Sequence, residues 1–423
     1  MKLHLESVSI TGVEFAERTG VADHTLYINK KALQELLEED PHFARVAVEL
    51  ATPGDPTRIV NVVDVVEPRC KIEGGEDFPG VLGKTVSAGA GITRALKGVP
   101  VVVCDRHPHW VHSKSLIDMS GPGAALGRYG AMTNVVIDPL PHGEIGDWDY
   151  AHSVKVAGCK AAAYLARAAA ADQVDGLETF HLEPAAGDLP RVAYYYQIYS
   201  PQHDARGIPD PIFYGYPIAT TLPLVVHPNE IIDGAVLSGY TIRMMESYSI
   251  QNHPLIFELF RRHGKELNFA GVVVGVASME SARRPLAALM VGNLVRDTLK
   301  AEGVIMTKPL GGAPTVDLGE AAVACEQRGV KSCLLVQLFN PETFLDSEAM
   351  FNDASLNAIV NTGIIFDTAS LPPLAQIIGG TEDTPVFHDT RRQVAGEELE
   401  VEQRFICGCL NQLGASSATA VQY

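Results

Sequence analysis

FAGVVVGV (residues 269–276), GVIMT (303–307) and SCLLVQL (332–338) are three apolar runs in the second half of the chain, and they decide the fold. A run that is apolar at successive positions is typical of a strand that is covered on both faces. A helix-like segment fills each of the two intervals between the runs. The order strand, helix, strand, helix, strand predicts a parallel α/β sheet.

The two intervening segments carry helix signals. In the first segment, Pro285 stands in the first turn of the expected helix, where proline is well tolerated. The second expected helix covers residues 316–328 and ends at Gly329, because glycine is a common C-terminal stop. A fourth strand is expected at residues 357–360. The apolar side chains on one side of the first helix are Leu286, Leu289, Met290 and Leu294.

The first half of the chain is predicted to be richer in strands. Residues 45–50 and 59–66 are strand-like runs between turn signals, and a short helix is expected around residues 31–39. A long helix is expected at about residues 149–171, with an alanine-rich apolar stripe from which Lys155 is excluded. The predicted fold class is therefore α/β, with an α+β N-terminal half and a parallel α/β C-terminal half.

Composition limits the class of protein. The 423 residues include 33 basic and 51 acidic side chains, which give a formal net charge of -18. This balance argues against nucleic acid or an anionic membrane as a partner, because both require a basic surface. No apolar run reaches the ~18 residues of a transmembrane helix, and Glu6 interrupts the segment where a signal peptide needs an apolar core. Seven cysteines, an odd and modest number, predict free thiols in a reducing, cytoplasmic setting.

The densest cluster of ligand-type side chains is CDRHPHWVH at residues 104–112. Thiolate and imidazole ligands suit zinc or iron, and in an extended segment His107 and His109 would point to the same side. The spacing matches no established zinc motif, so a histidine-rich loop that bonds to backbone or only binds substrate remains an open alternative. The candidate metal ligands are Cys104, His107, His109 and His112.

Two weaker signals lie elsewhere in the second half. Cys407 and Cys409 form a CGC pair, which is typical either of a redox dithiol or metal site or of two buried small side chains. We favour the second interpretation. The glycine-rich loop at residues 308–312 precedes a helix, where free N–H groups favour anions. It lacks the established nucleotide-binding patterns, so it gives only weak support for a nucleotide site.

Several sequence blocks together resemble the proprotein-type (alpha/beta) subunit of component B of the glycine, sarcosine and betaine reductases. The similarity runs over nearly the whole chain, and so many blocks in the same order indicate membership of the family. The blocks in the first half are VEPR (66–69), KIEGG (71–75), FPG (78–80), IDMSGPGA (117–124), TNVV (133–136) and VAGCKAAAYL (156–165). Those in the second half are DGAVLSG (233–239), QNHPLI (251–256), RHGKELNF (262–269) and LPP (371–373).

The resemblance implies a specific biochemistry and a division of the chain. Complexes of this family reductively remove the amine from glycine or an N-methylated relative, and a partner subunit carries a selenocysteine that takes the carboxymethyl group. The proprotein-type subunit cuts itself at an internal cysteine and so gains a pyruvoyl group, which is an electrophile toward amines. The corresponding halves of this chain are residues 1–239 and residues 240–423.

At the expected cut the chain departs from the family pattern. The family has a cysteine shortly after the DGAVLSG block, whereas this chain continues with Tyr240 and Thr241. Thr241 is the nearest match to the processing position, but cleavage there and elimination from threonine would give a 2-oxobutanoyl group. We therefore expect an unprocessed chain without a pyruvoyl group. Zinc or iron in the cluster at residues 104–112 is a candidate replacement for the carbonyl electrophile.

Three functions remain open from the sequence. The first is a subunit of a reductase-like complex that binds a small amino acid or N-substituted derivative for reductive C–N cleavage, with a cysteine- or selenocysteine-bearing partner chain. The second is a metal-dependent hydrolase or lyase on the same scaffold, and the third is a non-catalytic scaffold subunit. Polar positions in the family blocks are candidates for substrate binding, although turn capping would explain them equally well. These positions are Glu67, Arg69, Lys71, Asp118, Ser120 and Gly121.

Overall fold

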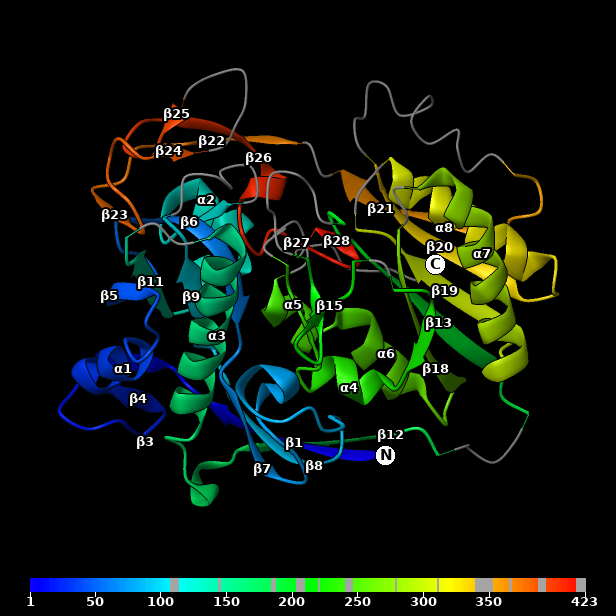
Figure 1. The fold of residues 1–423 in the computed structure, drawn as a ribbon, viewed down its shortest axis with the longest axis horizontal. Coiled ribbons are helices and arrows are strands. Elements are labelled where there is room, and N and C mark those ends of the chain that lie inside the picture. Colours follow the sequence, from blue (N-terminus) through cyan, green and yellow to red (C-terminus); the bar gives the residue numbers. More distant parts are fainter. Residues whose placement is uncertain are drawn as a thin grey trace.

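The structure is a computed structural model with two lobes, each built on a large β-sheet (Figure 1). A smaller four-stranded sheet lies between the lobes, at the bottom of the view in Figure 1. The structure describes residues 1–106, 114–143, 146–183, 188–202, 210–219, 221–239, 246–277, 280–309, 312–338, 353–364, 367–386 and 393–415.

The predicted parallel sheet forms the second lobe, at the right of Figure 1. Neighbouring strands are parallel throughout, except that the edge strand β16 runs antiparallel to β18. The fold-class prediction is therefore confirmed, and the strand expected at residues 303–307 is found with those bounds. In spatial order the strands are β16 (Leu224–Val226), β18 (Asn268–Val276), β13 (Arg191–Ile198), β19 (Gly303–Thr307), β20 (Lys331–Leu338) and β21 (Ala358–Ile364).

Helices cover both faces of this sheet, which explains why its strands are apolar at successive positions. Side chains alternate along β13, so that Tyr195 packs with the apolar cluster under α7 and α8. Tyr194 and Tyr196 point to the other face, toward the cluster formed with α4, α5 and α6. The helices of the first face are α7 (Arg284–Asn293) and α8 (Ala313–Glu326), and those of the second are α4 (Pro228–Ile232), α5 (Ser247–Gln251) and α6 (Pro254–Arg262).

The first lobe contains a mixed sheet on which the long helix α3 (Asp147–Ala166) packs. Its small residues permit a close approach, because a Cβ on Gly158 would lie 2.7 Å from a methyl carbon of Val103. One expectation for this helix is wrong: Lys155, predicted to lie off the buried stripe, is only 5% exposed because the chain at Ser238 covers it. The sheet strands are β10 (Ser115–Asp118), β6 (Thr57–Val66), β9 (Val101–Cys104), β11 (Asn134–Pro141) and β5 (Phe43–Ala51).

Smaller elements complete the two lobes. The four-stranded sheet comprises β12 (Gly176–His181), β1 (Lys2–Ser9), β8 (Gly91–Lys97) and β7 (Arg69–Glu73). The remaining helices are α1 (Lys30–Leu37) and α2 (Gly121–Leu126). The remaining strands are β2 (Gly12–Phe15), β3 (Gly20–Ala22), β4 (Thr25–Ile28), β14 (Ile212–Phe213), β15 (Tyr216–Pro217), β17 (Val236–Leu237), β22 (Thr368–Leu371), β23 (Gln376–Ile378), β24 (Pro385–Val386), β25 (Gln393–Val394), β26 (Leu399–Glu402), β27 (Leu410–Asn411) and β28 (Gly414–Ala415).

Strand pairing connects parts of the chain that are far apart in sequence. Strand β23 pairs in parallel with β6, so a segment near the C-terminus joins the sheet of the first lobe. Strand β13, from the first half of the chain, lies between β18 and β19 in the sheet of the second lobe. Strands from both sides of residue 239 thus share one sheet. The division into residues 1–239 and 240–423 stays a prediction.

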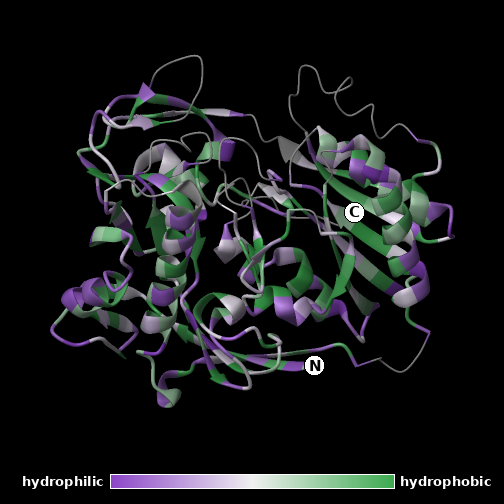
Figure 2. Cartoon of the chain, in the orientation of Figure 1, coloured by the Kyte–Doolittle hydropathy of each residue, from purple (hydrophilic) through white to green (hydrophobic). Residues whose placement is uncertain are grey.

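The distribution of hydropathy matches this architecture. Figure 2 shows apolar strands inside both lobes and polar residues along the outer helices. All seven cysteines are free, and Cys407 and Cys409 are buried, in agreement with the favoured interpretation of the CGC pair as small buried side chains. Within the described ranges, none of the helices has both the length and the apolar character that a bilayer crossing requires.

Candidate functional site

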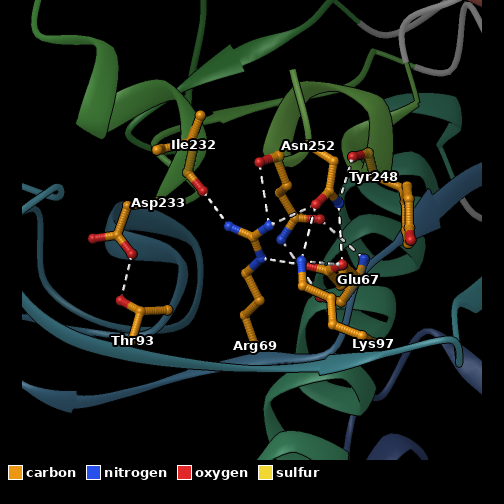
Figure 3. Close-up of polar contacts among 9 residues, drawn as sticks. Glu67, Arg69, Thr93, Lys97, Ile232, Asp233, Tyr248 and Asn252 are labelled. Atoms are coloured by element: carbon orange, nitrogen blue, oxygen red, sulfur yellow. Dashed lines mark hydrogen bonds and ion pairs between the residues drawn. The ribbon is translucent and has the colours of Figure 1, made fainter. Parts of the chain in front are cut away.

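The predicted substrate-binding residues Glu67 and Arg69 lie together in a buried ionic network just after strand β6. Arg69 Nε lies 2.6 Å from Glu67 Oε2, and Lys97 Nζ lies 2.9 Å from Glu67 Oε1 (Figure 3). Glu67 has no exposed surface. Burial alone would raise the pKa of Glu67, but the charges of Arg69 and Lys97 outweigh burial and lower it. The network is thus an ionised carboxylate between two cations.

The same network reaches segments on both sides of the expected cut site. Arg69 donates to the carbonyl oxygen of Ile232, at the end of α4, and at 3.2 Å to the carbonyl oxygen of Gln251, at the end of α5. Asn252 Oδ1 accepts from Arg69 at 3.2 Å and from Lys97 at 3.0 Å. Figure 3 shows these groups converging on the Arg69 guanidinium. Arg69 therefore fixes the ends of two short helices that are separated in sequence by the processing position.

Lys71 makes a second ionic contact with the segment that follows α4. Its Nζ lies 2.5 Å from Asp233 Oδ2, and the Gly89 N–H donates to the same oxygen at 2.7 Å. Thr93 Oγ1 donates to Asp233 Oδ1 at 2.5 Å (Figure 3). Because both oxygens of Asp233 are engaged, this carboxylate holds its segment in place. A small pocket beside it is lined by Arg69, Cys70, Lys71, Glu76, Asp77, Phe78, Thr93, Asp233 and Gln251.

Asp64 and Lys155 hold the chain immediately before and after residues 240–245. Ser247 donates to Asp64 through its N–H at 2.8 Å and through its Oγ at 2.7 Å. Lys155, from α3, donates to the carbonyl oxygen of Ser238, and the Ser238 N–H donates to Ser247 Oγ at 3.1 Å. Burial lowers the pKa of Lys155 and raises that of Asp64, while their mutual attraction opposes both shifts. Two groups from the first lobe thus fix Ser238 and Ser247.

Glu246 is the third buried carboxylate beside α5. Its Oε1 accepts from Tyr129 at 2.9 Å and from Ser249 Oγ at 2.7 Å. Burial raises the pKa of Glu246. The rings of Tyr129 and Tyr248 stand edge to face with centroids 5.4 Å apart. Glu246 therefore bonds to one member of an aromatic pair.

The other predicted substrate positions lie at the opposite end of β6. Asp118 is 1% exposed and accepts two hydrogen bonds from Arg58, at 2.7 and 2.9 Å. Ser120 and Gly121 stand at the start of α2, where Gly121 has a φ of 71° that favours glycine. The structure therefore brings Glu67, Arg69 and Lys71 together but not with these three residues.

Five predicted residues lie outside the described ranges: Tyr240, Thr241, His107, His109 and His112. Cys104, at the end of β9, is fully buried, and burial raises the pKa of its thiol. Among the residues that the structure describes, no group of three or more His, Cys, Asp or Glu side chains is placed to hold a metal ion. The metal-site hypothesis for residues 104–112 stays a prediction.

Sequence reasoning missed Asp64, Lys155 and Glu246. A signal existed for Asp64, because it is the one charged residue in the strand-like run at residues 59–66, where Asn61 is the other polar residue. Lys155 stands in an alanine-rich helix, where a lysine is ordinarily a solvated residue. Nothing local distinguished Glu246 from an exposed helix-start glutamate. The partners of all three come from other elements.

Comparisons with known proteins show the family of this chain. The sequence model of the family described as "Glycine/sarcosine/betaine reductase component B subunits" matches residues 1–421. The chain is 30% identical, over 100% of both chains, to the glycine reductase complex component B subunits alpha and beta of Acetoanaerobium sticklandii.

Two further relatives come from Peptoclostridium acidaminophilum. The chain is 34% identical, over 80% of each chain, to its sarcosine reductase complex component B subunit alpha. It is 30% identical to the betaine reductase complex component B subunit alpha, over 90% of this chain and 88% of that one. No solved structure matches. With a family match that spans residues 1–421, the chain belongs to the component B subunits of the glycine, sarcosine and betaine reductases.

Proposed function

We propose that this chain is an unprocessed component B-type subunit that binds a small amino acid or an N-substituted derivative for reductive cleavage of its C–N bond. A cysteine- or selenocysteine-bearing partner chain would receive the carbon fragment, and a thiol reductant would supply the electrons. The relatives are named for glycine, sarcosine and betaine reductase complexes, which supports both the substrate class and a hetero-oligomeric assembly.

One observation supports a location in the fold for the proposed function. Basic side chains of β7 and α3 hold residues 232, 233 and 238 on one side of the processing position, and Asp64 holds Ser247 on the other. A segment without a function would not need four buried ionic groups to fix the residues on its two sides, because each such group costs free energy to bury. We therefore place the reactive region of the subunit at this junction.

The pyruvoyl group that the family resemblance implies does not fit this chain. That group derives from a cysteine, and the cysteines here are Cys70, Cys104, Cys159, Cys325, Cys333, Cys407 and Cys409. None lies between the anchors Ser238 and Ser247, where Tyr240 and Thr241 stand instead. We therefore propose a subunit whose own residues bind and orient the substrate.

Intact mass spectrometry of the purified chain tests the processing part of the proposal. The expected result is a single species at the 45.4 kDa of the full chain. Two fragments that join at residues 240–241 would overturn it. A carbonyl reagent such as a hydrazine provides a second readout, since an uncut chain leaves no new N-terminal carbonyl to react.

Reconstitution tests the reductase part. The chain is assayed with its partner chain, a thiol reductant and glycine, sarcosine or betaine, and release of the amine is measured. We expect activity only when partner and reductant are both present. Full activity of this chain alone, without a reductant, would overturn the proposal.

A further inference from the structure

Three buried carboxylates surround α5, and among the residues that the structure describes only Glu67 of these three forms a salt bridge. Glu67 pairs with Arg69 and Lys97, and Asp64 is attracted by the buried Lys155. Glu246 is as deeply buried, with no exposed surface, yet no salt bridge joins it to any residue that the structure describes. Among the described residues, the cation whose charge acts on Glu246 is Arg128, which lies over the Tyr248 ring at 6.0 Å from the centroid.

The two oxygens of the Glu246 carboxylate differ in their hydrogen bonds. Oε1 accepts from Tyr129 and from Ser249. Oε2 is inaccessible to water and has no hydrogen-bond partner within the described ranges. Buried polar atoms are nearly always hydrogen-bonded in native proteins, so a bare carboxylate oxygen indicates that a donor is missing.

The groups around Glu246 suit a small cation. The electron-rich faces of tyrosine rings attract ammonium groups. Tyr129 donates its hydroxyl to this carboxylate, and the Tyr248 ring packs edge to face with Tyr129. The charge of Glu246 also acts on the buried hydroxyl of Tyr196, from the sheet of the second lobe, which hydrogen-bonds to the side chain of Gln412.

We propose that Glu246 Oε2 accepts a hydrogen bond from a protonated primary or secondary amine, which supplies the missing donor and brings a positive charge to hydrogen-bond distance. The inference rests on the proposed function for the identity of this amine, the amino end of the substrate. A quaternary ammonium has no N–H and leaves Oε2 without a donor. The site therefore selects glycine-like and sarcosine-like amines over a trimethylated one.

Thermal shifts of the full chain with small amines test this selectivity. Methylammonium, dimethylammonium and tetramethylammonium chloride are compared at equal ionic strength, with sodium chloride as the salt control. We expect the first two to raise Tm in a saturable way and tetramethylammonium to behave like sodium chloride. Equal shifts with all four salts would overturn the proposal.

Two variants locate the effect on Oε2. Glu246→Gln keeps an oxygen for Tyr129 and Ser249 but loses the charge, so binding of methylammonium should weaken at least about tenfold. Ser249→Ala is the matched control: it removes a donor to Oε1 only and should keep the response. If methylammonium raises the Tm of Glu246→Gln as much as that of the unchanged protein, the inference is wrong.

The failure of this inference is distinguishable from failure of the proposed function. If the reconstituted complex cleaves its substrate equally well with Glu246→Gln, the reductase function stands and the amine site does not. If methylammonium binds through Glu246 but no complex shows reductive activity, the amine site stands alone.

Discussion

Arg58 is the residue that fastens the C-terminal part of the chain to the first lobe. Its side chain has no exposed surface and makes two hydrogen bonds to Asp118. The remaining N–H groups donate to the carbonyl oxygens of Pro372 at 2.9 Å and Ala395 at 3.0 Å. The planar guanidinium presents donors in several fixed directions, which a lysine does not. One side chain therefore links β6, β10 and the segment after β22.

Replacing Arg58 by leucine should lower the free energy of unfolding by about 3–5 kcal/mol, because Asp118 is left as a buried charge without a partner. The first transition in urea measures this loss. Arg261→Ala is the control, since that side chain is 67% exposed, and its effect should stay within about 0.5 kcal/mol. A loss below about 1 kcal/mol in Arg58→Leu would contradict the role of Arg58 in joining these segments.

His253 is a residue whose surroundings fix its protonation state. Its Nδ1 accepts the N–H of Ile256 at 3.4 Å at the start of α6, and its Nε2 lies 3.1 Å from the hydroxyl of Tyr194. Because Nδ1 accepts, the neutral ring carries its proton on Nε2 and donates it to Tyr194. Burial lowers the pKa of His253 to about 3.

Stability should therefore fall as the pH decreases from about 6.5, the usual pKa of an unfolded histidine. Below that pH the unfolded chain binds a proton that the folded chain excludes, so the contribution is complete above 6.5 and is lost toward 3. His253→Asn keeps a capping side chain without titrating. Melting temperatures from about pH 5 to 7 should vary less in this variant, and equal slopes would refute the assignment.

Helix α3 shows what can be predicted for an element and what cannot. The spacing of its apolar residues predicts the helix, because that spacing reflects the local period of 3.6 residues. The burial of Lys155 depends on Ser238, 83 positions later in the chain, so no local pattern contains it. Asp64 is a similar case: its strand was predicted from apolar neighbours, whereas its partner Ser247 is 183 positions away.

The electrostatic attraction between Lys155 and Asp64 can be tested with a double-mutant cycle. Lys155→Met and Asp64→Asn should each destabilise the fold by about 3–5 kcal/mol, because each removes the opposite charge that acts on the other buried group. The double variant should lose less than the sum of the two, by at least about 0.5 kcal/mol. Additive losses would mean that the two groups act separately.

Lys160→Met provides a control for this cycle on the same helix. The side chain of Lys160 is 31% exposed and lies 3.6 Å from Glu39, whose side chain is 66% exposed. Exposed pairs of this kind contribute little to stability. We therefore expect a change within about 0.5 kcal/mol in Lys160→Met.

At the scale of the whole molecule, the two parts of the chain that flank residues 240–245 share their cores. Strand β13 lies in the middle of the second-lobe sheet, and β23 extends the first-lobe sheet beside β6. The sequence predicted the strands on both sides, because their apolar runs are local. It did not predict this exchange of strands, which depends on pairing between distant segments.

A chain cut between Gly239 and Glu246 should therefore stay together. A protease recognition sequence introduced there and cleaved should give two fragments that co-elute in size-exclusion chromatography, since separation would expose the central strand β13. The fragments should separate in denaturant. Separate elution in native buffer would show that the shared sheets do not hold them.

The pairing of β23 with β6 also has a consequence for synthesis. Thr57 bonds to Gln376, 319 positions later, so the sheet of the first lobe lacks its neighbouring strand until nearly the whole chain has been made. At about 5–20 residues per second this delay is roughly 16–64 s. During that interval residues 57–59 of β6 lack their β23 neighbour, and unpaired strand groups are a template for aggregation. A nascent chain that has not reached residue 376 therefore leaves this short part of the first-lobe sheet incomplete.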